Sequence, residues 1–245
     1  MGMTVDEQAH AAVMWHDVEC GSYAADLPTW HELAAGASGQ VLDLGAGTGR
    51  VALSLARLGH EVVALDRDAA LLAALRERAA GLALTTVEAD ARDFDLGRLF
   101  ALCICPMQTI QIVGGADDRM RLLACVRRHL AEGGVMAAAI ATDLEPFEEA
   151  SAPPLPDMRE DGDVVFASRP IALRVQAGEI VIERIRETVA PDGQRTEQSD
   201  TVRLARLSPR DLEREMRSAG FETLPVRRIL PTSEHVGSWV VMASA

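Results

Sequence analysis

Three glycines stand two residues apart between a short apolar run and a helical pattern. The run is VLDL, residues 41–44, and the glycines are Gly45, Gly47 and Gly49. Glycine adopts a positive φ at little cost and lets a ligand approach the backbone closely. The helix that follows offers unpaired N–H groups in its first turn. The pattern therefore predicts a cofactor-binding turn between a strand and a helix.

The spacing of these glycines argues against a dinucleotide enzyme. The dinucleotide fingerprint is G-x-G-x-x-G, with a pyrophosphate at the helix N-terminus. Here the sixth position is Arg50, so the spacing is G-x-G-x-G, and Asp43 lies inside the preceding strand. A nicotinamide dehydrogenase is therefore disfavoured, and a different nucleoside cofactor is expected.

The segment VLDLGAGTG resembles the first motif of the class I S-adenosylmethionine-dependent methyltransferases. The resemblance extends, in the order of elements, over about residues 10 to 245. It implies that the glycine turn wraps the amino acid part and the ribose of S-adenosyl-L-methionine, and that Asp43 orients the turn and the ammonium group. The cofactor-binding residues implied here are Asp43, Gly45, Ala46, Gly47 and Gly49.

The resemblance also implies roles for acidic residues after the next two strands. Asp66 ends the run VVALD about 20 residues past the turn, a reach that suits both ribose hydroxyls. Asp90, in VEADARDF, would bond the adenine amino group with the Ala91 backbone beside it. Arg67 is expected to lie over the adenine. A lone aspartate at a strand end is more often a turn former or a helix cap, but the three signals occur in the family's order and spacing.

The segment after the fourth predicted strand, CICPMQTIQIVGG, bears on the acceptor. Nucleic-acid methylating relatives carry Asn or Asp there, then Pro-Pro and an aromatic, whereas this chain has Cys105 followed by Pro106 and Met107. The departure and the net charge of −13 argue against a nucleic-acid partner. The segment resembles the small-molecule branch that includes glycine and sarcosine methyltransferases. Pro106, Met107 and Gln111 are predicted near the cofactor, with plain packing as the alternative for Gln111.

The N-terminal segment and the histidines supply candidates for closing the site and for proton transfer. Relatives form a lid there, so Tyr23, the only tyrosine, is predicted to contact the cofactor. A general base is needed only if the nucleophile arrives protonated, and histidine has a suitable unperturbed pKa. His235, before the last predicted strand, and His16, in the predicted lid, are the candidate catalytic residues.

Strand and helix signals alternate over the first 141 residues, which predicts an α/β fold. We expect a Rossmann-like, doubly wound, seven-stranded and mostly parallel sheet with helices on both faces, N-terminal lid helices and an antiparallel β insertion. The expected parts of a single methyltransferase domain, 1–245, are lid helices over about 4–36, a cofactor-binding core over 37–150, a proline-rich loop and antiparallel insertion over 151–207, and a helix with two strands over 208–245.

Composition excludes several other classes. The chain has 245 residues, 48% of them apolar, with no long apolar span and no signal-like start, so a cytoplasmic protein without membrane contact is expected. All 24 basic residues are arginine, which excludes a Schiff base or a lysine-bearing phosphate loop. Cys103 and Cys105 are too closely spaced for metal ligands and are expected to be buried thiols, so no metal is predicted.

These observations predict methyl transfer from S-adenosyl-L-methionine to an O, N or C atom of a small-molecule acceptor by in-line displacement. Two alternatives keep the same cofactor. One is a non-catalytic S-adenosylmethionine-binding protein, and the other is an enzyme of this fold that performs a non-methyl transfer such as aminopropyl transfer. No oligomeric state is predicted.

Overall fold

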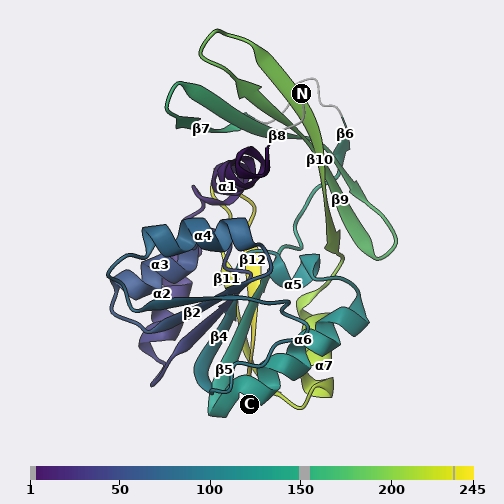
Figure 1. Ribbon diagram of the computed structural model, residues 1–245. Helices are drawn as coiled ribbons and strands as arrows, with labels where there is room; N and C mark the ends of the chain where they lie inside the picture. Colours follow the sequence, from purple (N-terminus) through teal and green to yellow (C-terminus); the bar gives the residue numbers. More distant parts are fainter. Residues whose placement is uncertain (1–3, 149–154, 234) are drawn as a thin grey trace. The chain divides into compact units, whose positions relative to one another are not determined.

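The chain divides into two units, each built around its own sheet, in the computed structural model, which describes residues 4–148, 155–233 and 235–245 (Figure 1). The core unit contains Ala24–Asp143 and Leu207–Ala245. The second unit, here called the insertion unit, contains the described residues up to Tyr23 and those from Leu144 to Arg206. The predicted lid segment is thus shared, because its first helix belongs to the insertion unit and its second to the core unit.

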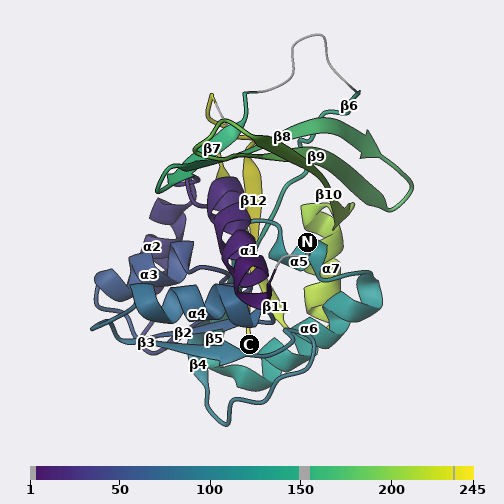
Figure 2. The ribbon, with the colours of Figure 1, turned by 45° about the horizontal axis from the view of Figure 1, so that its top comes forward.

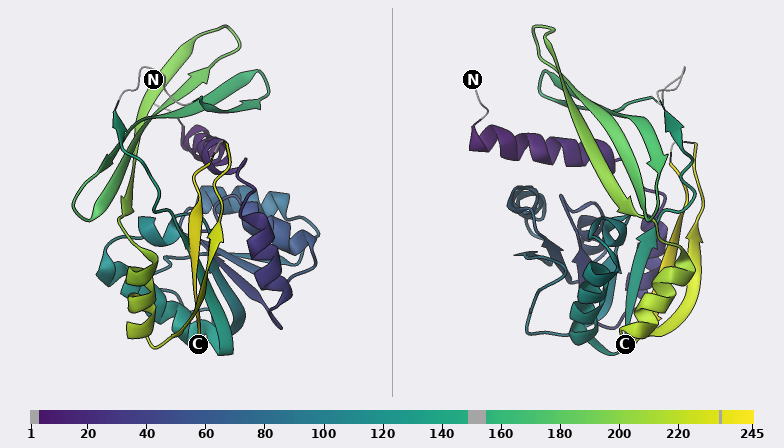
Figure 3. Two further views of the ribbon diagram at one scale, coloured as in Figure 1. Left: turned by 180° about the vertical axis from the view of Figure 1, so that it is seen from behind. Right: turned by 90° about the vertical axis from the view of Figure 1, so that its right-hand side faces the viewer.

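The core unit contains the predicted seven-stranded, mostly parallel sheet. Its strand order is β11-β12-β5-β4-β1-β2-β3, and only β12 runs against its neighbours. Figure 3 shows β11 and β12 side by side as a yellow pair. The strands are β1 (Val41–Leu44), β2 (Val62–Asp66), β3 (Leu84–Glu88), β4 (Phe100–Cys105), β5 (Leu130–Ile140), β11 (Glu222–Ile229) and β12 (Ser238–Ser244).

Helices cover both faces of this sheet, as predicted. Successive strand residues point to opposite faces, so Leu42 packs in the cluster under α6 and α7 while Val41 packs under α2, α3 and α4. None of the described helices combines the length and the apolar character needed to cross a membrane. The core helices are α2 (Leu27–Ala35), α3 (Arg50–Arg57), α4 (Ala69–Arg78), α5 (Thr109–Ile112), α6 (Ala116–His129) and α7 (Pro209–Ser218).

The insertion unit is an antiparallel sheet with one helix. The predicted antiparallel insertion is present, with the strand order β10-β9-β8-β6 and with β7 paired to β8 (Figure 2). Strand β7 occupies part of the predicted proline-rich loop, and residues 149–154 of that region lie outside the described residues. The elements are α1 (Val5–Cys20), β6 (Phe147–Glu148), β7 (Asp157–Asp161), β8 (Val164–Val175), β9 (Glu179–Val189) and β10 (Arg195–Ala205).

Helix α1 is held on the insertion sheet by an aromatic contact and a buried charge. Trp15 meets Phe166 of β8 edge to face, with ring centroids 5.2 Å apart. The Glu19 carboxylate accepts from Arg186 Nε at 2.7 Å and from Ser168 Oγ at 2.8 Å. Burial by itself would raise the pKa of Glu19, but the Arg186 hydrogen bond and the charges of Arg184 and Arg186 outweigh it and lower that pKa.

We predict that Glu19→Gln loosens α1 without disturbing the core unit. The change removes the carboxylate that pairs with Arg184 and Arg186 and leaves Arg186 with Asp200 alone, which costs about 3 kcal/mol. Hydrogen exchange of the α1 amides should therefore accelerate strongly, while that of β1 and β4 stays unchanged. Glu187→Gln is the matched control, because Glu187 pairs with Arg195, whose side chain is 70% exposed. Equal exchange in α1 of both variants would contradict the role assigned to Glu19.

Candidate functional site

The candidate site lies where the order of the core strands reverses. From β1 the chain continues to β2 and β3 on one side and returns to β4 on the other side of β1. In open α/β sheets, the crevice outside the carboxyl ends of such strands is where ligands bind. The glycine turn follows β1 and the segment from Pro106 follows β4. The two meet, since a Cβ added at Gly45 would lie 2.4 Å from Thr109 Cγ2.

The three glycines adopt the left-handed backbone that their pattern predicts. Their φ angles are 68° at Gly45, 54° at Gly47 and 93° at Gly49, and Gly49 is the N-cap of α3. The Gly45 N–H donates to the Leu65 carbonyl at 2.8 Å, which joins the turn to the end of β2. Ala46 is buried inside the turn. The left-handed backbone disfavours a β-branched side chain at each of the three glycine positions.

Asp66 connects the end of β2 to this turn through hydrogen bonds. Its Oδ2 accepts from the Gly47 N–H at 2.8 Å, and its Oδ1 accepts from the Asp68 N–H at 3.0 Å. An ionised carboxylate has about four acceptor positions, so each oxygen retains one for a further donor. The half-buried Asp66 thus has both a structural bond and spare acceptor capacity. Arg67, the next residue, is exposed.

Asp43 is a buried carboxyl group beneath the turn. The residue is 1% exposed, and its Oδ1 has no hydrogen-bond partner among the described residues. Burial raises the pKa of Asp43 to about 8, against the opposing positive charge of Arg50. The negative charge of Asp66 adds to the rise. A cationic group placed beside this carboxyl would favour its ionised form.

A buried ion pair at the start of α3 was not predicted. Arg50 donates from Nη1 and Nη2 to the two carboxylate oxygens of Asp26, at 2.6 and 2.7 Å. Asp26 also accepts from Trp30 Nε1 at 2.8 Å. Bidentate pairing of this kind is strong and directional. The residue that breaks the dinucleotide fingerprint therefore fastens α3 to the start of α2.

Asp90 follows β3 at the same edge. The Ala89 N–H donates to the Asp66 carbonyl at 2.9 Å, which sets Asp90 near the end of β2. The Asp90 carboxylate accepts from the Arg92 guanidinium and from the Arg92 N–H, and these bonds lower the pKa of Asp90 to about 2. Ala91, between them, is partly buried. The predicted adenine contact of Asp90 and Ala91 stays a prediction.

The segment after β4 has an unusual backbone. Met107 has φ 54°, and no other non-glycine residue of the described chain has a positive φ. Thr109 Oγ1 donates to the Pro106 carbonyl at 3.0 Å, closing the turn around Met107. Strained conformations of this kind cost free energy and concentrate at ligand sites. The predicted cofactor contacts of Met107 and of the buried Pro106 stay predictions.

Gln111 supports the end of β5 with its side chain. Its Nε2 donates to the Ala141 carbonyl at 3.1 Å, and its Oε1 accepts from the Ala141 N–H at 2.8 Å. The residue is 1% exposed. These bonds agree with the packing alternative, and the cofactor contact of Gln111 stays a prediction.

The remaining candidates lie away from the glycine turn in the sequence. Tyr23 is buried and His16 is partly buried, and both belong to the insertion unit. His235 lies in the core unit between β11 and β12, where its N–H donates to Thr232 Oγ1 at 2.9 Å. The roles predicted for these three residues stay predictions.

Two further predictions concern thiols and metals. Cys103 and Cys105 are buried in β4, as expected, and burial raises the pKa of both thiols. Within residues 4–148, 155–233 and 235–245, no group of three or more His, Cys, Asp or Glu side chains is arranged to hold a metal ion.

Comparisons with known proteins agree with this geometry. Residues 41–134 match the family model described as a methyltransferase domain. A curated relative, the cypemycin N-terminal methyltransferase of a Streptomyces species, is 33% identical over 110 residues. That alignment covers 45% of this chain and only 44% of the relative. Residues 41–134 thus carry the methyltransferase signature, and they include the glycine turn, Asp66 and Asp90.

Solved structures share the fold over nearly the whole chain. The amino pentose methyltransferase CalS10 of Micromonospora echinaspora, with bound S-adenosylmethionine, is 22% identical with a TM-score of 0.66, and the match covers 99% of this chain and 98% of that one. The glycopeptide N-methyltransferase MtfA, also in complex with S-adenosylmethionine, is 26% identical with a TM-score of 0.62, over 89% of this chain and 86% of that one. The fold is that of Rossmann-like methyltransferases.

We predict that Asp43 makes stability depend on pH. A folded-state pKa of about 8 exceeds the unfolded value of about 3.9. The folded chain therefore binds the extra proton between these values, and stability falls by up to about 1.4 kcal/mol per unit as pH rises through that window. Asp43→Asn should flatten the slope and be more stable than the parent at pH 7. The free energy of unfolding at each pH is measured by urea titration, with hydrogen exchange of the β1 amides as the probe.

The exposed Asp93→Asn is the control, because it removes a carboxylate near the same edge without removing the buried one. Its slope between pH 5 and pH 8 should equal that of the parent. Equal slopes in the parent and in Asp43→Asn would show that Asp43 is ionised when folded.

Proposed function

We propose that this chain, whose residues 41–134 match a methyltransferase domain, transfers a methyl group from S-adenosylmethionine to an amine nitrogen of a small molecule. One observation carries most weight: the glycine turn after β1 is bonded to Asp66 at the end of β2. This places a side-chain-free backbone and an acidic acceptor together at the strand ends where α/β folds bind ligands.

The residues present fit this cofactor. Asp66 keeps one acceptor position on each carboxylate oxygen, which suits the two hydroxyls of a ribose. The buried Asp43 Oδ1, without a partner, suits a cationic amino group nearby. The first turn of α3, which begins after the Gly49 N-cap, lies at the same place in the fold. Asp66 thus suits the ribose of the cofactor, and Asp43 suits its amino group.

The cofactor supplies a methyl group already activated on a sulfonium. The chain must therefore position the nucleophile in line with that group and exclude water, and positioning can supply most of the rate. The hydrogen bond from Thr109 Oγ1 to the Pro106 carbonyl closes the turn at Met107 after β4, at this edge. An amine must also arrive unprotonated, so a base such as His235 or His16 is part of the proposal.

An amine acceptor is supported by the relatives and by charge. The curated relative methylates an N-terminus by its name, CalS10 is named for an amino pentose, and MtfA for a glycopeptide nitrogen. The net charge of −13 favours cationic molecules over nucleic acid. Glycine and sarcosine, the acceptors of the branch expected from sequence, stay predictions within the same amine class.

The proposal is tested by turnover on a panel of amino sugars, peptides with free N-termini, glycine and sarcosine. We expect release of S-adenosylhomocysteine with an amine and an N-methylated product by mass spectrometry. Tight cofactor binding without turnover on any acceptor would favour the non-catalytic alternative. Turnover without S-adenosylhomocysteine would favour a non-methyl transfer.

We predict that Asp66→Ala weakens S-adenosylhomocysteine binding by about 1–3 kcal/mol, because charge-assisted bonds to the ribose are lost. Isothermal titration calorimetry measures the affinity. Glu88→Ala is the matched control, since Glu88 is an exposed carboxylate paired in register with Asp66. An affinity unchanged by Asp66→Ala, in a variant that folds, would remove the ribose role.

The two candidate bases are separated by their alanine variants. If His235 takes the proton, His235→Ala should lower kcat by about a hundredfold or more, the range of general base catalysis, and leave cofactor affinity unchanged. The same reasoning applies to His16→Ala. His60→Ala, before β2, is the control and should keep normal turnover. Normal kcat in both test variants would mean that the acceptor reaches the site already deprotonated.

A further inference from the structure

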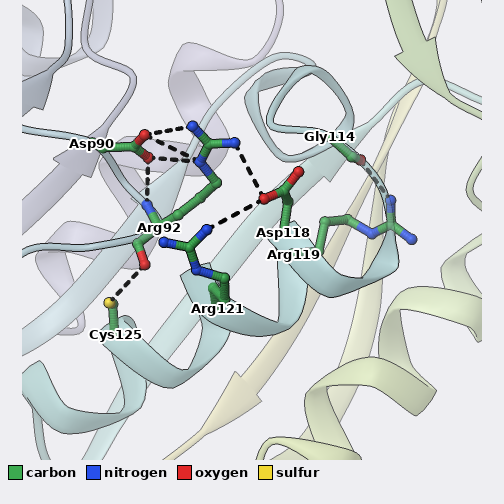
Figure 4. A network of polar contacts seen from close by, with 7 residues as sticks. All are labelled: Asp90, Arg92, Gly114, Asp118, Arg119, Arg121 and Cys125. Carbon is green, nitrogen blue, oxygen red and sulfur yellow. Dashed lines mark hydrogen bonds and ion pairs between the residues drawn. The ribbon is translucent and has the colours of Figure 1, made fainter.

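The Arg92 guanidinium forms hydrogen bonds with the carboxylate of Asp90, the residue predicted to bind the adenine of the cofactor. Arg92 Nη2 donates to Asp90 Oδ2 at 2.6 Å, and Arg92 Nε lies 2.9 Å from Oδ1 and 3.1 Å from Oδ2. The Arg92 N–H also donates to Oδ1 at 2.8 Å. The Asp93 N–H donates to the Asp90 carbonyl at 2.9 Å, so Asp90 and Arg92 belong to one tight turn. Figure 4 shows the bonds between the Asp90 carboxylate and Arg92.

These bonds leave Asp90 with little spare capacity. Of about four acceptor positions on a carboxylate, Oδ1 gives one to the Arg92 N–H and one to Nε, and Oδ2 gives one to Nη2. The same Nε–H also lies 3.1 Å from Oδ2, so the one remaining position, on Oδ2, is shared with this longer bond. The Asp90 side chain is 38% exposed, so that position is open to a single external donor.

Residues of α6 hold Arg92 in place through hydrogen bonds. Its Nη1 donates to Asp118 Oδ1 at 3.2 Å, and Arg121 Nη1 lies 3.7 Å from the same oxygen. The Arg92 carbonyl accepts from Cys125 Sγ at 3.3 Å. Gly114 lets Asp118 approach, since a Cβ there would lie 2.3 Å from Asp118 Oδ2. Arg92 is therefore held both at its main-chain carbonyl and at its guanidinium group (Figure 4).

We propose that Arg92 is a positioning residue that sets the base selectivity of the cofactor site, because it holds Asp90 as an acceptor-only carboxylate aimed at an exocyclic amino group. The inference rests on the proposed function and deepens it. It assigns the choice of adenine over hypoxanthine to a residue that does not touch the base.

The physical reason is the fixed orientation of an ionised carboxylate. Asp90 is ionised at neutral pH even with the usual aspartate pKa of about 3.9, and the Arg92 bonds lower that pKa further, to about 2. The contribution of Arg92 is therefore to fix the direction of the two carboxylate oxygens through its Nε, Nη2 and backbone N–H. An adenine amino group meets this acceptor as a donor. The carbonyl oxygen of hypoxanthine is an acceptor, so it would face the carboxylate with both groups unpaired.

The test compares calorimetric affinities for S-adenosylhomocysteine and its deaminated analogue, S-inosylhomocysteine. The parent should prefer the adenine compound by about a hundredfold or more, because sites built around a polar group reject ligands that leave it unpaired. Arg92→Gln should reduce the preference to about tenfold or less, mainly by weakening the adenine compound. Arg121→Gln removes an equal charge that lies 3.7 Å from Asp118 and acts on Asp90 through its charge alone, and both of its affinities should stay within about twofold of the parent.

Arg92→Lys guards against a variant that does not fold. Lysine keeps the charge but loses the planar fork, so its preference should fall between those of the parent and Arg92→Gln. In turnover, both Arg92 variants should raise the KM for S-adenosylmethionine and leave kcat unchanged. A purely structural role would lower thermal stability without changing the base preference, and that result would overturn the inference.

Failure of this inference differs from failure of the proposed function. A parent chain that binds neither compound contradicts the proposed function, and the inference falls with it. A parent chain that binds S-adenosylhomocysteine tightly, with the same base preference in Arg92→Gln, contradicts the inference alone.

Discussion

The bond from the Gly47 amide to the Asp66 carboxylate is the contact on which the site depends. Three left-handed glycines make a turn that a ligand can touch, but they provide no side chains to hold that turn in place. The turn is therefore fixed from outside, by Asp66, by the Leu65 carbonyl and by the Arg50–Asp26 pair at the start of α3. Each anchor comes from a neighbouring strand or helix, so the geometry of the turn depends on the packing of the whole sheet edge.

Four carboxyl groups in this part of the core unit differ because their neighbours differ. Asp26 is buried against a bidentate arginine, while Asp43 is buried without such a partner and its pKa rises. Asp66 is half-buried and accepts from the backbone, and Asp90 is half-exposed beside Arg92 with a lowered pKa. Pairing with an arginine, burial and hydrogen bonding thus place the same side-chain type in four different environments within this part of the core unit.

The sheet, the glycine turn and the position of Asp66 at the end of β2 can be predicted from the sequence because their signals are local. Apolar runs, alternating glycines and strand-end aspartates lie within a few residues of the structure they specify. The Arg50–Asp26 pair joins residues 24 positions apart, and Glu19 meets Arg186 across 167 positions, so only the folded chain brings these groups together. The Asp90–Arg92 contact is the exception, since an aspartate that caps its own turn is a recognisable local pattern. The conformation of Met107 has no such signal, because nothing in its residue type favours a positive φ.

The division of α1 from α2 has a consequence for how the protein is made. On the ribosome, α1 emerges before the insertion sheet, because Ser168, which binds Glu19 of α1, is synthesised 149 residues after it. Trp15 and Val18 therefore have no sheet to cover them while most of the core unit is being translated. The core unit is likewise unfinished until β12, which lies between β5 and β11, leaves the exit tunnel. Both units thus close late over long chain separations, which slows folding and prolongs the exposure of apolar surface to chaperones.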